Sequence, residues 1–220
     1  MQIDIIFDTI CPWCFIGKRR LEAALRQRPN VNAEIIWHAF LLNPDMPPEG
    51  MDRQEYMVIK FGGESRSRRV NNAIIEAGKT VGIEFNFDHV GRMPSTVDSH
   101  RLVRFAAAAG YAGQMVEALY QAYFLEGRDI GHRSVLFDIA GQLDLDIEAL
   151  RDYLYSGRDV DDINEQNARA HRLGISGVPA FIFDGEFAIS GAQEPSVLLR
   201  MFDIAEEKRR EWMVEGTQPV

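Results

Sequence analysis

Cysteine is scarce in this sequence, and Cys11 and Cys14 are the only two among 220 residues. So few cysteines exclude a small domain held together by a framework of disulfides. Long hydrophobic runs are also missing, and no stretch approaches the roughly 20 apolar residues that a membrane-spanning helix needs. We therefore expect neither a disulfide scaffold nor a membrane as a partner.

Basic residues are in deficit, with 24 Lys and Arg against 33 Asp and Glu and a formal net charge of -9 at pH 7. Nucleic acid is not an expected partner, because phosphate backbones are bound through an excess of Lys and Arg. Residues 1–10 contain no basic residue and no small-residue cleavage site, so they do not resemble a signal peptide. These observations predict a cytoplasmic protein.

The overall composition is that of an ordinary globular protein, with 46% hydrophobic and 26% charged residues. Its strongest local signal is the segment Cys11-Pro12-Trp13-Cys14. The β-branched and aromatic residues before this segment, at positions 3–7, are typical of a buried strand. The apolar residues after it recur at helical spacing, and Pro12 suits a first helical turn, where no amide hydrogen is needed. We therefore expect Cys11 at the N-terminal end of a helix.

This position predicts redox chemistry for Cys11. Free amide groups and the helix dipole stabilise a thiolate at a helix N-terminus. Cys14 lies one helical turn further in and is expected to be more buried. We therefore expect Cys11 to attack a disulfide sulfur and Cys14 to resolve the mixed disulfide that forms.

Two other interpretations of the cysteine pair remain open. A structural zinc site needs four ligands, but the five histidines lie singly along the chain, so we expect no metal. Alternatively, both cysteines are inert core residues, as free cysteines often are.

The rest of the chain predicts an α/β protein. A second strand is expected around residues 35–37, which gives a parallel β-α-β unit, and a hairpin followed by a helix is expected from residues 180–183, 187–190 and 195–209. Between them the periodicity is mainly helical, with expected helices at 71–81, 96–109, 112–126, 133–142, 147–155 and 160–173. Ser95, three residues before Asp98, is the expected N-cap of the second of these helices. Residues 1–50 and 160–220 are expected to form one domain, and residues 51–159 a large helical insertion.

A second site signal is Val178-Pro179 at the start of the hairpin. Taken alone, Pro179 is most simply an edge-strand residue. If the Val178-Pro179 bond is cis, however, the backbone of Val178 is free to pair with an extended substrate segment near the cysteines.

Four sequence blocks, at residues 7–18, 40–45, 99–102 and 174–181, together resemble the DsbA-like branch of the thioredoxin fold, and most closely its FrnE-like members. Neighbouring relatives are 2-hydroxychromene-2-carboxylate isomerases and kappa-class glutathione transferases. The resemblance implies a thioredoxin-like fold (β-α-β and β-β-α) and thiol-disulfide oxidoreductase activity on protein or low-molecular-weight disulfides. It also implies that Cys11 and Cys14 form the redox pair and that Pro179 is a cis-proline facing them. In this interpretation Pro12, Trp13, Val178 and Pro179 contact the substrate.

Two other functions are compatible with the same residues. A glutathione-dependent isomerase or transferase uses glutathione as a co-substrate, needs no bound cofactor, and can dispense with Cys14. Such relatives usually have Ser in place of Cys11, so Cys11 favours redox chemistry. The third candidate is a binding module that holds an extended peptide against Val178 and Trp13.

Asp8 and His100 are weaker candidates for a pocket near the cysteines. Asp8 directly follows the first strand and could relay a proton, although a capping or solvated aspartate is the simpler interpretation. His100 is as compatible with a buried, hydrogen-bonded histidine as with a ligand contact. The oligomeric state, the physiological substrate and the direction of disulfide exchange cannot be derived from these residues.

Overall fold

A four-stranded mixed sheet forms the centre of the protein, with the strand order β2-β1-β5-β6. The computed structural model describes residues 1–215, with side chains through residue 212. The strands are β1 (Gln2–Phe7), β2 (Glu34–Ala39), β5 (Ala180–Phe183) and β6 (Phe187–Ser190). Ile5 of β1 lies opposite Trp37 of the parallel strand β2 and opposite Phe181 of the antiparallel strand β5. The predicted β-α-β unit and β-hairpin are therefore both present.

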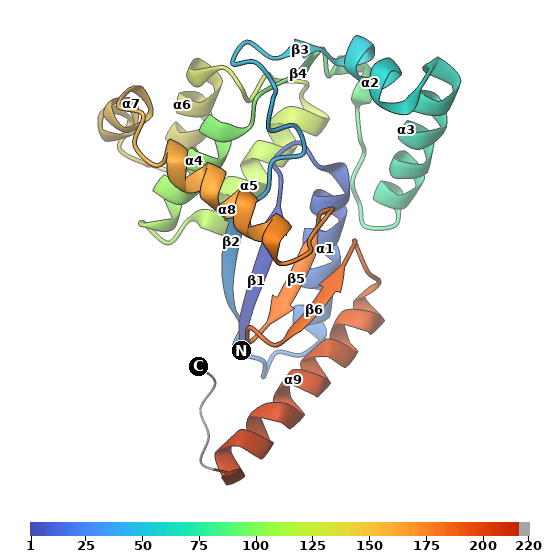
Figure 1. Ribbon diagram of the computed structural model, residues 1–220, viewed down its shortest axis with the longest axis vertical. Coiled ribbons are helices and arrows are strands. Elements are labelled where there is room, and N and C mark those ends of the chain that lie inside the picture. Colours follow the sequence, from blue (N-terminus) through green and yellow to red (C-terminus); the bar gives the residue numbers. More distant parts are fainter. Residues whose placement is uncertain (216–220) are drawn as a thin grey trace.

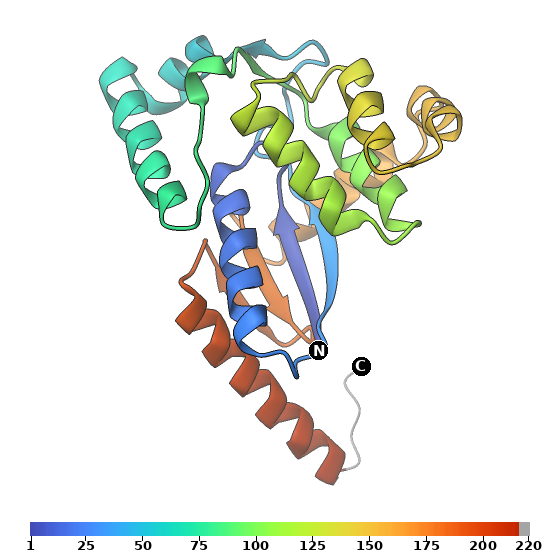
Figure 2. The same ribbon diagram turned by 180° about the vertical axis from the view of Figure 1, so that it is seen from behind.

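Helices cover both faces of this sheet (Figure 1 and Figure 2). They are α1 (Pro12–Gln27), α8 (Val160–Arg172) and α9 (Pro195–Glu215). Successive side chains of a strand point to opposite faces. Ile5 and Phe7 of β1 accordingly join the core cluster that contains Phe15 of α1, whereas Ile6 packs with Ala170 of α8. Burial on both faces explains why Ile5, Ile6 and Phe7 of β1 are consecutive apolar residues.

A helical insertion lies at the end of the sheet where β1 ends, with α2 and α3 on one side and α4 to α7 on the other (Figure 1). Its elements are β3 (Met51–Asp52), α2 (Arg53–Phe61), α3 (Glu64–Lys79), the 3-10 helix η1 (Phe87–His89), β4 (Arg92–Met93), α4 (Val97–Ala107), α5 (Ala112–Tyr120), the π-helical segment η2 (Gln121–Leu125), α6 (Arg133–Gly141) and α7 (Ile147–Tyr155). Within residues 1–215, no helix has the length and apolar character needed to cross a membrane.

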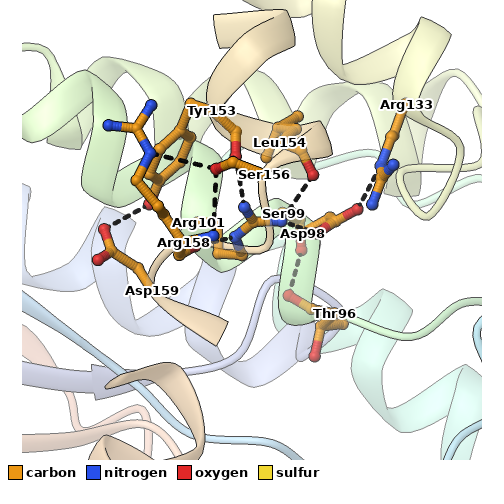
Figure 3. Close-up of polar contacts among 10 residues, drawn as sticks. All are labelled: Thr96, Asp98, Ser99, Arg101, Arg133, Tyr153, Leu154, Ser156, Arg158 and Asp159. Atoms are coloured by element: carbon orange, nitrogen blue, oxygen red, sulfur yellow. Dashed lines mark hydrogen bonds and ion pairs between the residues drawn. The ribbon is translucent and has the colours of Figure 1, made fainter. Parts of the chain in front are cut away.

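Arg101 of α4 is fully buried and connects two parts of the insertion (Figure 3). Its guanidinium donates to the carbonyl oxygens of Tyr153 at 2.6 Å, Leu154 at 3.1 Å and Arg158 at 2.7 Å. Asp98, one turn earlier in α4, accepts from the same guanidinium at 2.6 Å. A helix leaves its last carbonyl groups without partners, and Arg101 satisfies those of α7. The contact fixes α4 against the end of α7.

Several expected boundaries need correction. The helix expected at 71–81 begins earlier, at Glu64, and α2 was not predicted as a separate helix. The first turns of α3 are polar and bury only Ser67, so they carry no apolar periodicity. Ser95 is not the N-cap of α4; Thr96 is, and it makes no side-chain capping bond. The division into residues 1–50 with 160–220 and residues 51–159 stays a prediction.

Candidate active site

The two cysteines lie where β1 passes into α1. After Phe7, the chain continues through three buried residues to Cys11, which is the N-cap of α1. The Sγ atom of Cys11 accepts a hydrogen bond from the backbone N–H of Cys14 at 3.3 Å. Pro12 occupies the first helical position, as expected. The helix N-terminus is therefore aimed at the Cys11 sulfur, where it favours negative charge.

The two cysteines are almost equally buried. Both thiols are free and buried, with exposed fractions of 3% for Cys11 and 2% for Cys14. Burial, followed by the hydrogen bond and charge of Cys11, raises the pKa of Cys14 well above its ordinary value. Cys14 is therefore held as a protonated thiol in the reduced protein.

The hairpin loop approaches the cysteines from a distant part of the sequence. The Val178-Pro179 peptide bond is cis, as the resemblance implied. The thiol of Cys11 donates to the carbonyl oxygen of Val178 at 3.4 Å. Thus Cys11 and Val178, far apart in sequence, are in direct contact.

Gly17 of α1 lets this loop come close. A Cβ atom at this position would lie 2.9 Å from Cγ of Pro179 and 3.2 Å from Cζ of Phe181. Both distances are tighter than ordinary contacts, so a larger residue would push the loop away. Sequence analysis did not assign Gly17 a role, although its place three residues after Cys14 was a usable signal.

Asp8 and His100 meet behind the cysteines. The Asp8 carboxylate accepts from the backbone N–H of Leu42 at 2.7 Å and lies 3.3 Å from Nε2 of His100. The backbone carbonyl of Asp8 accepts from the N–H of Cys11 at 3.1 Å. Asp8 is fully buried and His100 is 2% exposed. The pair therefore fixes the backbone that leads into the cysteine segment.

Two further groups of the insertion reach the same backbone, and sequence analysis missed both. Ser99 of α4 shares a hydrogen bond of 2.7 Å with the hydroxyl of Thr9. Tyr120 of α5 donates from its hydroxyl to the carbonyl of Asp8 at 3.3 Å and stacks on Phe15. Burial, and then the nearby Cys14 and Cys11, raise the pKa of Tyr120. Nothing in the sequence pairs residues 8–9 with residues 99–120, because these contacts arise from tertiary packing.

A cavity of about 290 Å³ opens beside Cys11. The segment of Cys11 to Trp13, Val178, α2 and α3 contribute to its walls. Its lining is mainly apolar, but it includes the polar side chains of Asn43, Arg53, Tyr56, Lys60, Asn71 and Tyr123. A larger groove of about 1050 Å³ lies beside β2 and is lined by His100 but by neither cysteine.

The polar groups of the smaller cavity form a short chain. Lys60 donates to the hydroxyl of Tyr56, which donates to Oδ1 of Asn43 at 2.5 Å. Nδ2 of Asn43 is buried and has no partner within the described residues. The guanidinium of Arg53 lies 4.7 Å from the centre of the Phe87 ring, and burial lowers the pKa of Arg53. These groups suit a small ligand with hydrogen-bond acceptors or negative charge.

In the part of the chain that the structure describes, no three His, Cys, Asp or Glu side chains are grouped to hold a metal ion. Asp8 and His100 do not line the cavity beside Cys11. Of the residues predicted from the sequence, Cys11, Pro12, Trp13 and Val178 do line it.

Comparison with known proteins gives matches over nearly the whole chain. The sequence model of the DSBA-like thioredoxin domain matches residues 2–203. The uncharacterized protein YwbO of Bacillus subtilis is 25% identical over 211 residues, which cover 95% of this chain and 99% of YwbO.

Solved structures also have this fold. The probable DsbA oxidoreductase SCO1869 of Streptomyces coelicolor superposes with a TM-score of 0.85 at 25% identity, covering 100% of this chain and 92% of that one. The cytosolic disulfide reductase DsbM of Pseudomonas aeruginosa superposes with a TM-score of 0.67 at 19% identity, covering 97% and 100%. These similarities confirm the predicted fold class.

Proposed function

Because the chain belongs to the family of DSBA-like thioredoxin domains, we propose that it is a thiol-disulfide oxidoreductase with Cys11 as nucleophile and Cys14 as resolving thiol. One observation carries the proposal. The Cys11 sulfur is the N-cap of α1 and contacts both the Cys14 amide at 3.3 Å and the Val178 carbonyl at 3.4 Å. A sulfur in this position is activated by the helix and lies beside the backbone of the cis-proline loop.

The first step is attack by the Cys11 thiolate on a substrate disulfide. A mixed disulfide forms between Cys11 and one substrate sulfur, and the other substrate sulfur leaves as a thiolate that takes up a proton. The free amides at the start of α1 stabilise the attacking thiolate.

The second step is resolution by Cys14. Its thiol loses a proton and attacks the Cys11 sulfur, which forms the Cys11–Cys14 disulfide and releases the second substrate thiol. The substrate gains two electrons and the protein pair loses two. The same steps in reverse oxidise a substrate dithiol. Asp8 and His100, in this proposal, position the segment before Cys11 and do not touch the substrate.

Substrate contacts follow from what surrounds Cys11. Trp13 is 38% exposed, and it lines the cavity together with Pro12 and Val178. We assign these three residues and Pro179 to substrate binding, with an extended disulfide-containing peptide or a small disulfide as substrate. We place this activity in the cytoplasm, in keeping with the similarity to DsbM, a cytosolic disulfide reductase.

The test uses single-cysteine variants and a disulfide-linked peptide pair as substrate. The reduced wild-type protein should release both peptides and end as the Cys11–Cys14 disulfide, Cys14→Ala should stop at a mixed disulfide on Cys11, and Cys11→Ala should form no adduct. Intact-mass analysis distinguishes these states. Release of both peptides by Cys14→Ala at the wild-type rate would contradict the proposal.

A second candidate is a glutathione-dependent isomerase or transferase. It is favoured by the small cavity, whose Arg53 and Lys60 side chains suit the carboxylates of glutathione as a co-substrate. Here Cys11 only orients the glutathione thiol, so Cys14→Ala should leave isomerase or transferase turnover intact.

A further inference from the structure

Helices α2 and α3, which line the cavity beside Cys11, have a net charge opposite in sign to that of the rest of the protein. Residues 53–79, which include α2 and α3, contain six basic and three acidic residues, a net charge of +3. The remaining residues contain 18 basic and 30 acidic residues, a net charge of -12. A positive region in an acidic protein attracts anions locally while the rest of the surface repels them.

Two basic residues of this region, Arg53 and Lys60, line the cavity beside Cys11. Met57 and Lys60 of α2 and Val70 and Ile74 of α3 line the cavity together with Cys11. Arg66, Arg68 and Arg69 lie on the same stretch of α3 as Val70, and all three are exposed. We call Lys60, Arg66, Arg68 and Arg69 the basic rim.

The three arginines of the basic rim have no ion pair within the described residues. Several arginines elsewhere do: Arg104 pairs with Asp159 at 2.9 Å and with Asp162 at 2.8 Å, and Arg128 pairs with Asp138 at 3.1 Å. In α3 itself, Glu76 pairs with Lys79 rather than with an arginine. The guanidinium groups of the rim are therefore available for carboxylates, which they bind in a planar, two-pronged geometry.

We propose that the basic rim of α2 and α3 is a docking surface for an acidic stretch of a protein substrate, placed so that the substrate disulfide reaches Cys11. The inference rests on the proposed oxidoreductase activity and adds the substrate class. Charge complementarity identifies the occupant, since Arg66 to Arg69 span about one helical turn, which matches a few successive Asp or Glu residues. A long nucleic acid fits less well because it would extend from this short patch over the acidic remainder of the surface.

The effect should appear mainly in the association rate. Electrostatic steering speeds encounter at low salt and is screened as ionic strength rises. A substrate with Asp and Glu beside its disulfide should therefore react faster than a neutral one, and only at low salt.

The experiment measures reduction of self-quenched, disulfide-linked peptide pairs by the reduced protein in a stopped-flow instrument. The peptides differ only in the residues flanking the cysteines, which are acidic, neutral or basic. At 20 mM NaCl we expect the acidic peptide to react about tenfold faster than the neutral one, the lower end of the range for steering, and at 500 mM NaCl the two rates should converge.

A charge-matched pair of variants identifies the surface. The variant Arg66→Gln/Arg68→Gln/Arg69→Gln should lose most of the acidic preference. The control Arg26→Gln/Arg200→Gln/Arg210→Gln removes three exposed arginines that also have no ion pair within the described side chains. Arg26 lies in the last turn of α1 and the other two lie on α9, which is at the opposite end of the molecule from α2 and α3 (Figure 1). The control should keep the preference although its net charge is the same.

Uncharged dithiothreitol separates failure of this inference from failure of the proposed function. Both triple variants and the wild type, oxidised beforehand to the Cys11–Cys14 disulfide, should be reduced by dithiothreitol at equal rates. No exchange in the wild type would overturn the proposed function. Normal exchange without an acidic preference, or with equal loss in both triple variants, would overturn the docking surface. The docking surface would also be overturned if Arg66→Gln/Arg68→Gln/Arg69→Gln left the peptide rates unchanged but lost binding to single-stranded RNA.

Discussion

Cys11 and Cys14 differ in environment although they are three positions apart. Cys11 contacts the Val178 carbonyl beside the cavity, while Cys14 faces the buried groups around Asp8 and Tyr120. The proton of Cys14 is therefore retained up to a higher pH than that of an ordinary thiol. This difference suits one sulfur to attack a substrate and the other to wait until a mixed disulfide has formed.

The raised pKa of Cys14 predicts a pH dependence of stability. The folded state binds this proton more tightly than the unfolded state, whose thiol has a pKa of 9.0. The stabilisation is therefore complete below pH 9 and is lost as pH rises towards the folded-state pKa. Above pH 9, the free energy of unfolding of the reduced protein should fall by up to about 1.4 kcal/mol per pH unit from this group.

Urea unfolding of the reduced protein between pH 7 and pH 10 measures this slope. Cys14→Ser removes the titrating thiol and should flatten the curve between pH 9 and pH 10. That interval lies below the ordinary tyrosine pKa of 10.0, so Tyr120 contributes little to it. Equal slopes for the variant and the wild type would refute the assignment.

Replacing Gly17 with alanine should lower the stability of the protein, which is opposite to the usual effect of this change in a helix. Helical Gly→Ala changes ordinarily stabilise by about 0.4–1 kcal/mol. At Gly17, however, the added methyl group meets Pro179 at 2.9 Å, so Gly17→Ala should destabilise by about 1–3 kcal/mol and slow disulfide exchange. Gly113→Ala on α5 is the control, because its methyl group meets only Trp37 at 4.0 Å. Urea midpoints that shift equally in both variants would contradict the close approach.

At the scale of elements, α4 connects the cysteine segment to the insertion. The consecutive residues Ser99 and His100 contact Thr9 and Asp8, and Arg101 binds the end of α7. One short stretch of helix therefore contacts both regions. The block at residues 99–102 in the sequence resemblance coincides with this stretch.

Arg101→Met should destabilise the protein by about 3–5 kcal/mol, because the carbonyl groups of Tyr153 and Leu154 at the end of α7, and that of Arg158 beyond it, all lose this buried donor. Arg104→Met is the matched control. Arg104 is exposed and pairs with Asp159 and Asp162, so its loss should cost about 0–1 kcal/mol. Chemical denaturation of both variants checks this, and similar losses would show that Arg101 has no special role.

Much of this arrangement of elements could be predicted from the sequence, and the exceptions have physical causes. The strands at 180–183 and 187–190 and the helix at 147–155 have clear periodicity and have the predicted bounds. The start of α3 escaped prediction because its first turns are almost wholly exposed and polar. In the site, the sequence identified Cys11, Cys14 and Val178-Pro179 through local signals. The contacts of Thr9 and Tyr120 depend on distant packing and left no such signal.

At the scale of the molecule, one continuous core joins the sheet to the insertion. Phe15 of α1 stacks on Tyr120 of α5 with ring centres 5.0 Å apart, and the same cluster includes Phe202 of α9. We therefore expect sheet and insertion to unfold together in one cooperative transition. Coincident far-ultraviolet and near-ultraviolet dichroism curves in urea would show this. Two separated transitions would mean that the insertion folds independently.

The most direct test of the central claim is the reduction potential of Cys11 and Cys14. The protein is equilibrated in a series of glutathione redox buffers, and its free thiols are alkylated and counted by mass. The account predicts one reversible two-electron transition, in which both thiols are lost together, between about -270 and -120 mV. Failure to form the Cys11–Cys14 disulfide, or a stable glutathione adduct on Cys11 alone, would contradict it.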